Sequence, residues 1–224
     1  GLSAAIYVNR ESFDGKTFNG NEGHIVRNDP ANDEDITIKK CSFNEIIVSD
    51  GSSAIILRSK FKLLLGLSMT ETTFTKCISG NNPGAIDASI SQISVTKTCF
   101  SECKGYDSAA TIRFVSRAGH ELSFNYSTFR KSETSLVDSS PLSAAFFDGG
   151  LLYYCNCNAS NNYIKPFAGD RVEGMSVYLG ITCLSSRGSI VALDSTFENN
   201  EGIPSLAVVS ITPFKYVSRL NFFN

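Results

Sequence analysis

The chain has 224 residues and a formal net charge of −2, with 20 Lys and Arg against 22 Asp and Glu. Its positive residues are scattered, so the composition excludes the basic stripe that nucleic-acid binding needs. No apolar run approaches the roughly 18 residues of a membrane-spanning helix, so membrane contact is expected only through segments outside this chain.

The N-terminal region predicts a coil of a solenoid that is already under way. Gly1–Val8 has the small and apolar residues of a coil strand, so we expect the chain to be a piece of a longer solenoid. A loop-like stretch follows with a cluster of acidic residues: Asp29, Asp33, Glu34 and Asp35. We interpret this cluster as a solvated connection, with a weak calcium site as the alternative.

Four segments alternate apolar and polar residues, which is the pattern of a strand with one buried face. They are Ile36–Lys39, Leu67–Thr70, Ile93–Thr96 and Leu122–Asn125. In each copy, apolar residues stand seven and five positions before a phenylalanine. Because the phenylalanine stands at the same offset from the inward residues in all four copies, it occupies an equivalent position in each repeat, and we expect it to point inward as well.

A short motif, Thr-x-Phe or a close variant, carries these phenylalanines. Its copies are Cys41–Phe43, Thr72–Phe74, Thr98–Phe100, Ser127–Phe129 and Ser195–Phe197. The first four phenylalanines are 31 (74 − 43), 26 (100 − 74) and 29 (129 − 100) residues apart. We assign Cys155–Cys157 and Phe223 to the same series, because Cys157 follows Phe129 by 28 residues and Phe223 follows Phe197 by 26. A period in this range predicts one repeated supersecondary unit.

A second apolar run, entered through small residues, follows each phenylalanine, as in Gly51–Leu57 and Pro83–Ile86. Each period therefore holds at least two short strands and two turns. We expect an all-β fold, a right-handed parallel β-helix (a pectin-lyase-like solenoid) of roughly seven to eight coils that forms a single domain over residues 1–224. The alternative is a β-sandwich, but it would need hairpin turns, and only Asn19-Gly20 resembles one.

Stacked coils would place equivalent residues in columns. We expect one buried aromatic column, formed by Phe43, Phe74, Phe100, Phe129 and Phe197. One coil is expected to be irregular, because Cys157 and Phe197 are 40 residues apart (197 − 157). We therefore predict an insertion over residues 158–187, with Tyr163-Ile164 and Val177–Leu179 as its strands.

The seven cysteines are an odd number, which leaves at least one without an internal disulfide partner. Cys77 and Cys103 each follow a phenylalanine of the column by three residues, so they should be neighbours on successive coils. We favour reduced, inward-facing side chains over a disulfide, which the coil spacing would also allow. Zinc at Cys99 and Cys103, or at Cys155 and Cys157, is disfavoured because no histidine lies near either pair.

Two four-residue patterns recur. Phe18–Asn21 and Phe197–Asn200 read Phe-x-x-Asn, Phe74–Cys77 and Phe100–Cys103 read Phe-x-x-Cys, and Pro83–Ile86 keeps part of a Gly-Gly-Ala-Ile motif. Over most of its length the chain thus resembles the polymorphic outer-membrane protein repeats of chlamydial autotransporters and similar cysteine-containing surface proteins of parasitic protists. The resemblance implies a right-handed parallel β-helix that acts as an adhesin or surface coat.

The same fold carries polysaccharide lyases and hydrolases, which need clustered carboxylates. The aspartates after the acidic cluster do not share one position relative to the phenylalanines: Asp87, Asp107, Asp138, Asp148 and Asp194. His24 and His120 lack the partners of a catalytic triad. We therefore predict no catalytic residue, no metal site and no cofactor.

The expected function is that of a non-enzymatic surface or adhesive fragment from a membrane-anchored parent protein, located at the cell surface or outside the cell. Its expected partners are host-cell or extracellular surface ligands. The alternatives are a carbohydrate-active lyase or hydrolase and an internal scaffold with reduced cysteines. Asn125 and Asn158 begin N-glycosylation sequons, and Asn158 is the favoured acceptor because a turn is expected there.

Overall fold

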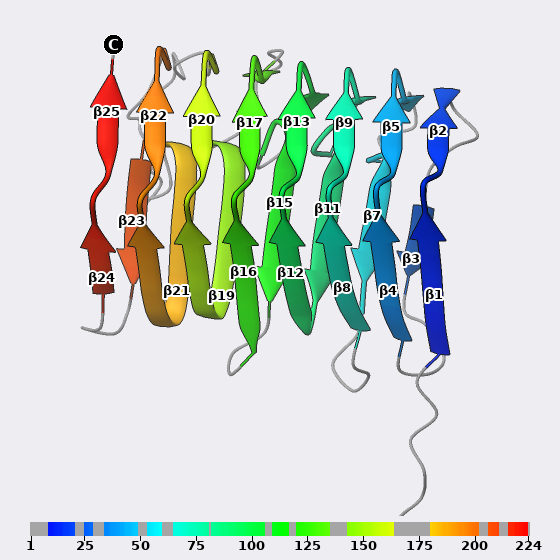
Figure 1. The fold of residues 1–224 in the computed structure, drawn as a ribbon, viewed down its shortest axis with the longest axis horizontal. Helices are drawn as coiled ribbons and strands as arrows, with labels where there is room; N and C mark the ends of the chain where they lie inside the picture. Colours follow the sequence, from blue (N-terminus) through cyan, green and yellow to red (C-terminus); the bar gives the residue numbers. More distant parts are fainter. Residues whose placement is uncertain are drawn as a thin grey trace, which may run out of the picture.

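The computed structural model describes residues 9–20, 25–28, 34–48, 53–59, 65–80, 82–105, 109–116, 120–134, 143–163, 180–201, 206–210 and 215–223 (Figure 1). These residues contain strands and no helix, and their strands pair only in parallel. A sandwich of hairpins is thereby excluded, because hairpin strands are antiparallel. The expected all-β parallel β-helix is confirmed, whereas its handedness and its number of coils stay predictions.

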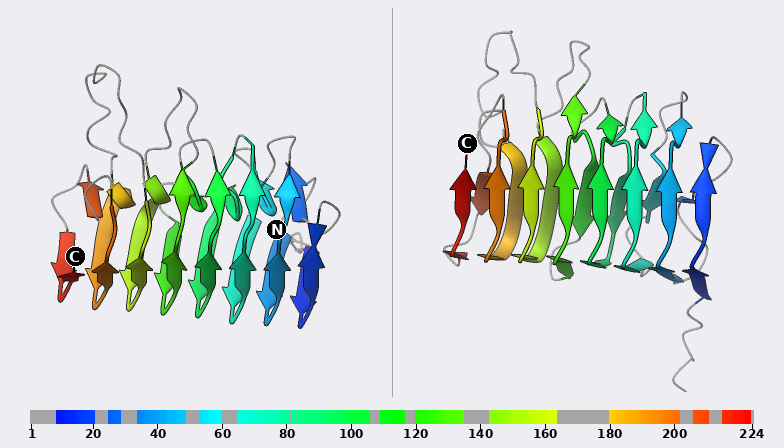
Figure 2. Two further views of the ribbon diagram at one scale, coloured as in Figure 1. Left: turned by 90° about the horizontal axis from the view of Figure 1, so that it is seen from above. Right: turned by 45° about the horizontal axis from the view of Figure 1, so that its top comes forward.

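The main sheet has 13 strands and curls into a front limb and a rear limb (Figures 1 and 2). The front limb contains β1 (Asn9–Asp14), β4 (Glu34–Lys39), β8 (Leu65–Thr70), β12 (Gln92–Thr96), β16 (Glu121–Asn125) and β24 (Lys215–Ser218). The rear limb contains β3 (Ile25–Asn28), β7 (Ile55–Arg58), β11 (Ile86–Ile90), β15 (Ile112–Ser116) and β23 (Leu206–Ser210). The long strands β19 (Ser143–Cys155) and β21 (Gly180–Leu193) run through both limbs.

Two smaller sheets complete the coils. The second sheet contains β2 (Thr17–Asn19), β5 (Ser42–Asn44), β9 (Thr73–Thr75), β13 (Cys99–Ser101), β17 (Thr128–Arg130), β20 (Asn158–Ser160), β22 (Thr196–Glu198) and β25 (Asn221–Phe223). The third sheet contains β6 (Ile47–Val48), β10 (Ile78–Ser79), β14 (Lys104–Gly105) and β18 (Glu133–Thr134). Each coil therefore passes from the front limb to the second sheet, and four successive coils then enter the third sheet before the rear limb.

Two corners per coil are made by residues with left-handed backbone conformation. The first corner, between the front limb and the second sheet, uses Lys40, Glu71, Lys97, Tyr126, Asn156, Asp194 and Arg219, with φ between 50° and 54°. The second corner, which follows the second sheet, uses Glu45, Lys76, Glu102, Lys131, Asn161 and Asn199, with φ between 49° and 57°. Each of these conformations costs about 1 kcal/mol in a residue other than glycine, so the coil stack must compensate for it.

The compensation comes from the backbone hydrogen bonds between coils. At the first corner, the Lys97 N–H donates to the Asn125 carbonyl of the next coil at 3.2 Å. At the second corner, the Lys76 N–H donates to the Ser101 carbonyl at 2.9 Å. Because the corner amides bond to the next coil, the chain turns without leaving an N–H group unpaired.

The aromatic column runs through the interior behind the second sheet. Strand register places Phe18, Phe43, Phe74, Phe100, Phe129, Ala159, Phe197 and Phe222 at one position of successive coils. Phe43 and Phe74 stack with ring centroids 4.5 Å apart, and Phe74 and Phe100 follow at 4.9 Å. The five phenylalanines predicted from the sequence are all buried in this column.

Two other members of the repeat series do not lie at the column position. Ala159, rather than Cys157, pairs with Phe129, and Phe222, rather than Phe223, pairs with Phe197. Alanine leaves space in the column, and the ring of Tyr154 lies against Phe197 with centroids 6.3 Å apart. The aromatic contact is thus continued at that coil by a ring from the front limb.

Small polar side chains occupy the two inward positions beside the aromatic column. After the second corner, Cys77, Cys103, Asn162 and Asn200 each bond to the backbone carbonyl of the column residue in the preceding coil. This contact gives a physical reason for the fourth residue of the Phe-x-x-Asn and Phe-x-x-Cys patterns. A short side chain with a donor is needed there, because it must reach a buried carbonyl without disturbing the rings.

The predicted insertion over residues 158–187 has the wrong boundaries. Residues 158–160 form β20 and residues 180–187 belong to β21, and both strands are in register with their neighbours. The long coil itself is present, because 38 residues separate Ala159 from Phe197 (197 − 159). Tyr163 forms isolated bridges with Glu133 and Glu201, while Ile164 and the predicted strand Val177–Leu179 lie outside the described residues.

Replacement of Phe100 by alanine is expected to lower the free energy of unfolding by about 3–5 kcal/mol. The Phe100 side chain is fully buried and stacks on Phe74, so the change opens a cavity in the middle of the column. Phe223→Ala is the control, because that side chain is 57% exposed. Chemical denaturation measures both changes, and a Phe100→Ala protein as stable as the parent would contradict the column.

Candidate functional site

The outward side of the front limb forms a regular face, which we call the front face. Seven outward side chains along it are partners in strand register, one from each successive strand between β4 and β24: Thr37, Ser68, Ser94, Ser123, Tyr153, Val191 and Tyr216. We call this series the axial row, because it runs along the stack of coils. Its first four members carry hydroxyl groups on short side chains, and two of its last three are tyrosines.

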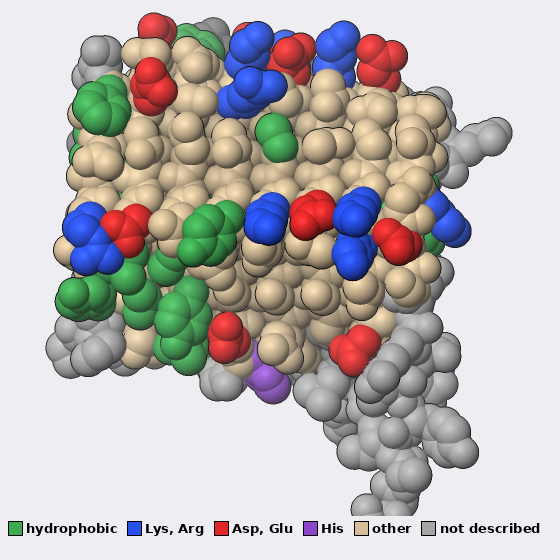
Figure 3. Space-filling model, in the orientation of Figure 1, with side chains coloured by type: hydrophobic (Ala, Val, Ile, Leu, Met, Phe, Trp, Pro, Cys, Tyr) green, Lys and Arg blue, Asp and Glu red, His purple; other side chains and the backbone are tan. Residues whose placement is uncertain are grey.

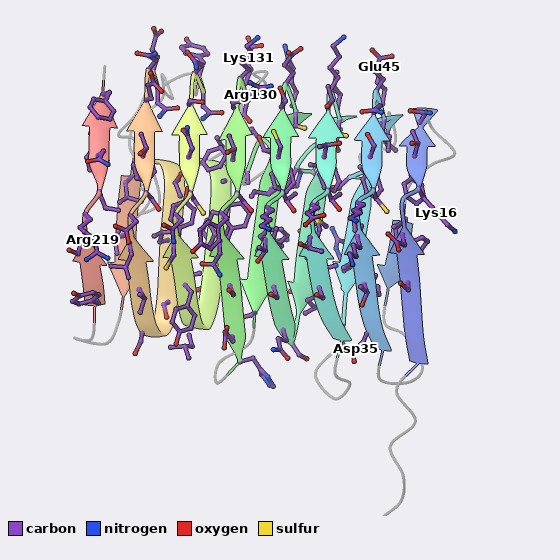
Figure 4. The ribbon with its side chains drawn as sticks, viewed as in Figure 1. Lys16, Asp35, Glu45, Arg130, Lys131 and Arg219 are labelled. Atoms are coloured by element: carbon purple, nitrogen blue, oxygen red, sulfur yellow. The ribbon has the colours of Figure 1, made fainter. Side chains whose placement is uncertain are left out.

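A shallow groove of about 410 Å³ lies at the N-terminal end of the front face. The polar side chains around it are Asp35, Thr37, Ser68, Gln92 and Ser94. Gly66 also lines the groove, and a Cβ atom at this glycine would lie 2.5 Å from Asp35 Oδ1. The absence of a side chain at position 66 therefore allows the exposed Asp35 carboxylate to lie over the sheet (Figure 4).

Hydrophobic side chains gather at the C-terminal end of the front face (Figure 3). Tyr153, Val191 and Tyr216 of the axial row lie on β19, β21 and β24, and Tyr216 is 53% exposed. Tyr126, at the first corner of the coil before Tyr153, is 61% exposed. The front face thus changes from small hydroxyl groups to aromatic rings along the axis.

The two corner columns carry charges of alternating sign, visible as rows of blue and red in Figure 3. The pairs are Glu45 with Lys76 at 3.3 Å, Glu102 with Lys131 at 3.8 Å, Glu71 with Lys97 at 3.9 Å and Asp194 with Arg219 at 2.5 Å. Hydrogen bonding from Arg219 lowers the pKa of Asp194 below its usual value. Because these groups are exposed, each pair adds little stability, but together they leave no single-sign patch along the corners.

One buried carboxylate lies in the rear limb. Asp87 Oδ2 is 2.6 Å from Arg58 Nη2, and Asp87 Oδ1 is 2.7 Å from Arg113 Nη1. The Asp87 side chain is 1% exposed, whereas the two arginines keep contact with solvent. Asp87 was considered in the sequence only as one of several scattered aspartates, and its two arginine partners were missed. The repeats contain a signal for the pairing, since Asp87 and Arg113 each follow an isoleucine that enters the rear limb.

The predicted cysteine neighbours lie where the repeat pattern places them. Cys77 and Cys103 are fully buried at equivalent positions of successive coils, and both are free thiols. Burial raises the pKa of the Cys103 thiol, and contact with Cys77 adds to this effect. Their Sγ atoms lie 3.7 Å and 3.9 Å from the carbonyls of Phe43 and Phe74, so they serve as short capping side chains.

The two sequon asparagines lie in strands. Asn125 ends β16, and its Nδ2 donates to Ser123 Oγ at 2.5 Å. Asn158 begins β20, which corrects the expectation that it begins a turn. Both side chains are partly exposed, and their modification stays a prediction.

The other residues considered for catalysis do not converge. His120 precedes β16 and Asp148 lies in β19, while His24, Asp29, Asp33, Asp107 and Asp138 lie outside the described residues. Within the part of the chain that the structure describes, no three His, Cys, Asp or Glu side chains are grouped so that they could hold a metal ion. A search of the same part for a helix long and apolar enough to cross a membrane found none.

Comparison of the chain with protein-family models, with curated proteins and with solved structures found no match.

Replacement of Asp87 by asparagine is expected to lower the free energy of unfolding by about 2 kcal/mol, because a buried hydrogen-bonded charge is lost between two arginines that can still contact water. Asp194→Asn is the matched control. It also removes a carboxylate bonded to arginine, but both partners are exposed, so little change is expected. Equal effects of the two substitutions in chemical denaturation would show that the Asp87 cluster has no special structural role.

The thiol of Cys157 should make stability depend on pH in the alkaline range. Burial raises its pKa to about 12 from an ordinary value of 9.0. Above about pH 9 the unfolded chain releases this proton while the folded chain keeps it. The free energy of unfolding should therefore fall as the pH rises toward 12, by up to about 1.4 kcal/mol per pH unit from this thiol.

Cys157→Ser tests this pH dependence. Ser127 and Ser195 occupy the same position in the neighbouring coils and bond to the same kind of backbone carbonyl, so serine is expected to fit. The variant should lose less stability than the parent between pH 8 and pH 10.5, measured by urea unfolding. Parallel pH profiles for the two proteins would contradict the assignment.

Proposed function

We propose that this chain is a non-enzymatic recognition fragment, presented at a cell surface or outside the cell, whose front face binds an extended surface ligand. The axial row is the observation that carries the proposal. It places one outward side chain per strand in register across seven successive strands of the main sheet. A surface with one contact per coil suits a ligand that is itself extended and repetitive.

The rigidity of the stack supports this role. The interior is filled by rings and small polar groups whose hydrogen bonds are made within the stack, so the front face is held by the fold before a ligand binds. A preorganised surface loses little conformational entropy on binding. This arrangement supports recognition by a fixed face.

The carboxylate arrangement gives less support to the enzymatic alternative. Glycoside hydrolysis commonly uses two carboxylic groups on either side of the scissile bond. Among the residues around the described groove, Asp35 contributes a carboxylate, and the other polar groups are hydroxyls and the amide of Gln92. We therefore assign Asp35 a role in hydrogen bonding to a ligand.

Binding of the labelled fragment to cultured animal cells and to plant and fungal cell walls tests the proposal. Ser94→Arg places a bulky charge in the middle of the axial row and should abolish binding. Thr73→Arg is the matched control, because Thr73 is exposed on the outward side of the second sheet, and it should bind like the parent. Circular dichroism confirms that each variant keeps its strand content.

Three results would overturn the proposal. One is binding that Ser94→Arg leaves unchanged, and a second is an absence of binding by the parent to all of these surfaces. The third is release of reducing or unsaturated sugars from polysaccharides that disappears in the Asp35→Asn variant, which would establish an enzyme.

A further inference from the structure

The tyrosines at the C-terminal end of the axial row have a regular spacing. Tyr153 pairs with Val191, and Val191 pairs with Tyr216. Neighbouring strands are about 4.8 Å apart, so the two tyrosines are separated by two spacings, or about 9.6 Å along the axis. Val191 has a short side chain, so a ligand can contact both tyrosines without meeting a bulky group between them.

This spacing favours a particular polymer. In an extended β-1,4-linked polysaccharide each sugar is turned over relative to the one before it, so equivalent faces recur at every second sugar. Tyrosine offers a flat apolar ring and a hydroxyl group, which suit the C–H face and the rim hydroxyls of a sugar. Two tyrosines two strands apart can therefore contact equivalent faces of sugars that are two units apart.

The remainder of the axial row suits the same ligand. Thr37, Ser68 and Ser94 provide one short hydroxyl side chain per strand at the groove, whereas Ser123 is only 9% exposed and its Oγ accepts a hydrogen bond from Asn125. From Tyr216 to Thr37 the row spans six spacings, or about 29 Å. Hydroxyl groups can donate and accept hydrogen bonds, as sugar hydroxyls do, so a chain of several sugars has a polar contact at each of the three strands that carry Thr37, Ser68 and Ser94.

The charges near the row favour an uncharged ligand. The seven side chains of the axial row are themselves uncharged, and Asp194 and Arg219 beside Tyr216 neutralise each other. Asp35 and Glu121 lie on the edge of the front limb that is farther from the first corner and add negative charge there, while the exposed Lys39 adds a positive charge on the side of the first corner. An acidic polysaccharide would meet these carboxylates, whereas a neutral one would use them as hydrogen-bond acceptors.

We infer that the front face binds an extended, uncharged β-1,4-linked polysaccharide laid along the coil stack, with Tyr153 and Tyr216 against alternate sugars. The inference rests on the proposed function, because it names the ligand of the same face. Tyr126, exposed at the neighbouring corner, extends the aromatic surface on the side toward the second sheet.

Isothermal titration calorimetry with cellohexaose and chitohexaose tests the inference, using protein made without glycosylation so that Asn125 is unmodified. Maltohexaose, an α-linked hexamer of glucose, is the ligand control. At least one β-linked hexamer should bind, and more tightly than maltohexaose. Tyr153→Ala and Tyr216→Ala should each weaken binding about tenfold or more, because each removes one aromatic contact.

Tyr163→Ala is the matched protein control. Tyr163 is 40% exposed but pairs with Glu133 and Glu201 away from the front face, so this variant should bind like the parent. Tyr153→Phe should keep most of the affinity, which separates ring contact from loss of the hydroxyl group. The inference fails if neither β-linked hexamer binds, if maltohexaose binds equally well, or if Tyr153→Ala and Tyr163→Ala have the same effect.

The cell-binding assay distinguishes this failure from failure of the proposed function. If Ser94→Arg abolishes cell binding while Tyr153→Ala and excess cellohexaose and chitohexaose do not affect it, the front face binds a ligand of another class. In that case the recognition role stands and the polysaccharide assignment is wrong.

Discussion

The structure depends on the corner residues that turn the chain while keeping it in the hydrogen-bond ladder between coils. A parallel sheet can bend only if the bend leaves few backbone groups unpaired. Lys97 and Glu102 adopt left-handed conformations at the two corners of one coil, and the N–H of each donates to a carbonyl of the next coil. The steric cost of the bend is thus offset by a ladder that continues through it.

The hydrogen-bond ladder keeps successive coils in strict register. This register then determines how the side chains are arranged both in the interior and on the exterior of the stack. Inside, it stacks the phenylalanines and sets small polar groups on either side, where Asn162 and Asn200 bond to each other and to neighbouring carbonyls. Outside, the same register aligns Lys and Glu at the corners and produces the axial row on the front face. A ligand along the axis would therefore meet the same periodicity that stabilises the core.

The sequence predicts the repeating parts of this fold well. Aromatic and apolar residues at fixed offsets identify the buried column, because a large inward side chain leaves a strong periodic pattern. Ala159 was missed because alanine at a column position has no such signature, so the nearby Cys157 was assigned instead. Many corner residues gave no signal either, since the ladder imposes a left-handed conformation on Lys and Glu, whereas only some corners carry the glycine or asparagine that would ordinarily be expected, such as Gly15, Gly20 and Asn156.

The candidate site was less predictable, because it depends on which outward residues become neighbours. Tyr153 and Tyr216 are 63 residues apart (216 − 153) and meet through Val191 only when the register of the long coil is known. Asp87 and its two arginines likewise come from three different coils. Short sequence motifs are enough to identify each coil. Side chains from different coils that lie together can be identified only when the strand register between those coils is known.

Native-state hydrogen exchange, measured by NMR for individual amides, tests the central claim about the corners most directly. The side chains of Glu71, Lys97 and Glu102 are in contact with solvent, yet their amides bond to the next coil. The account predicts that these amides exchange about as slowly as those of the adjoining strands. Exchange at the rate of open surface turns, with slow exchange confined to the strands, would contradict it.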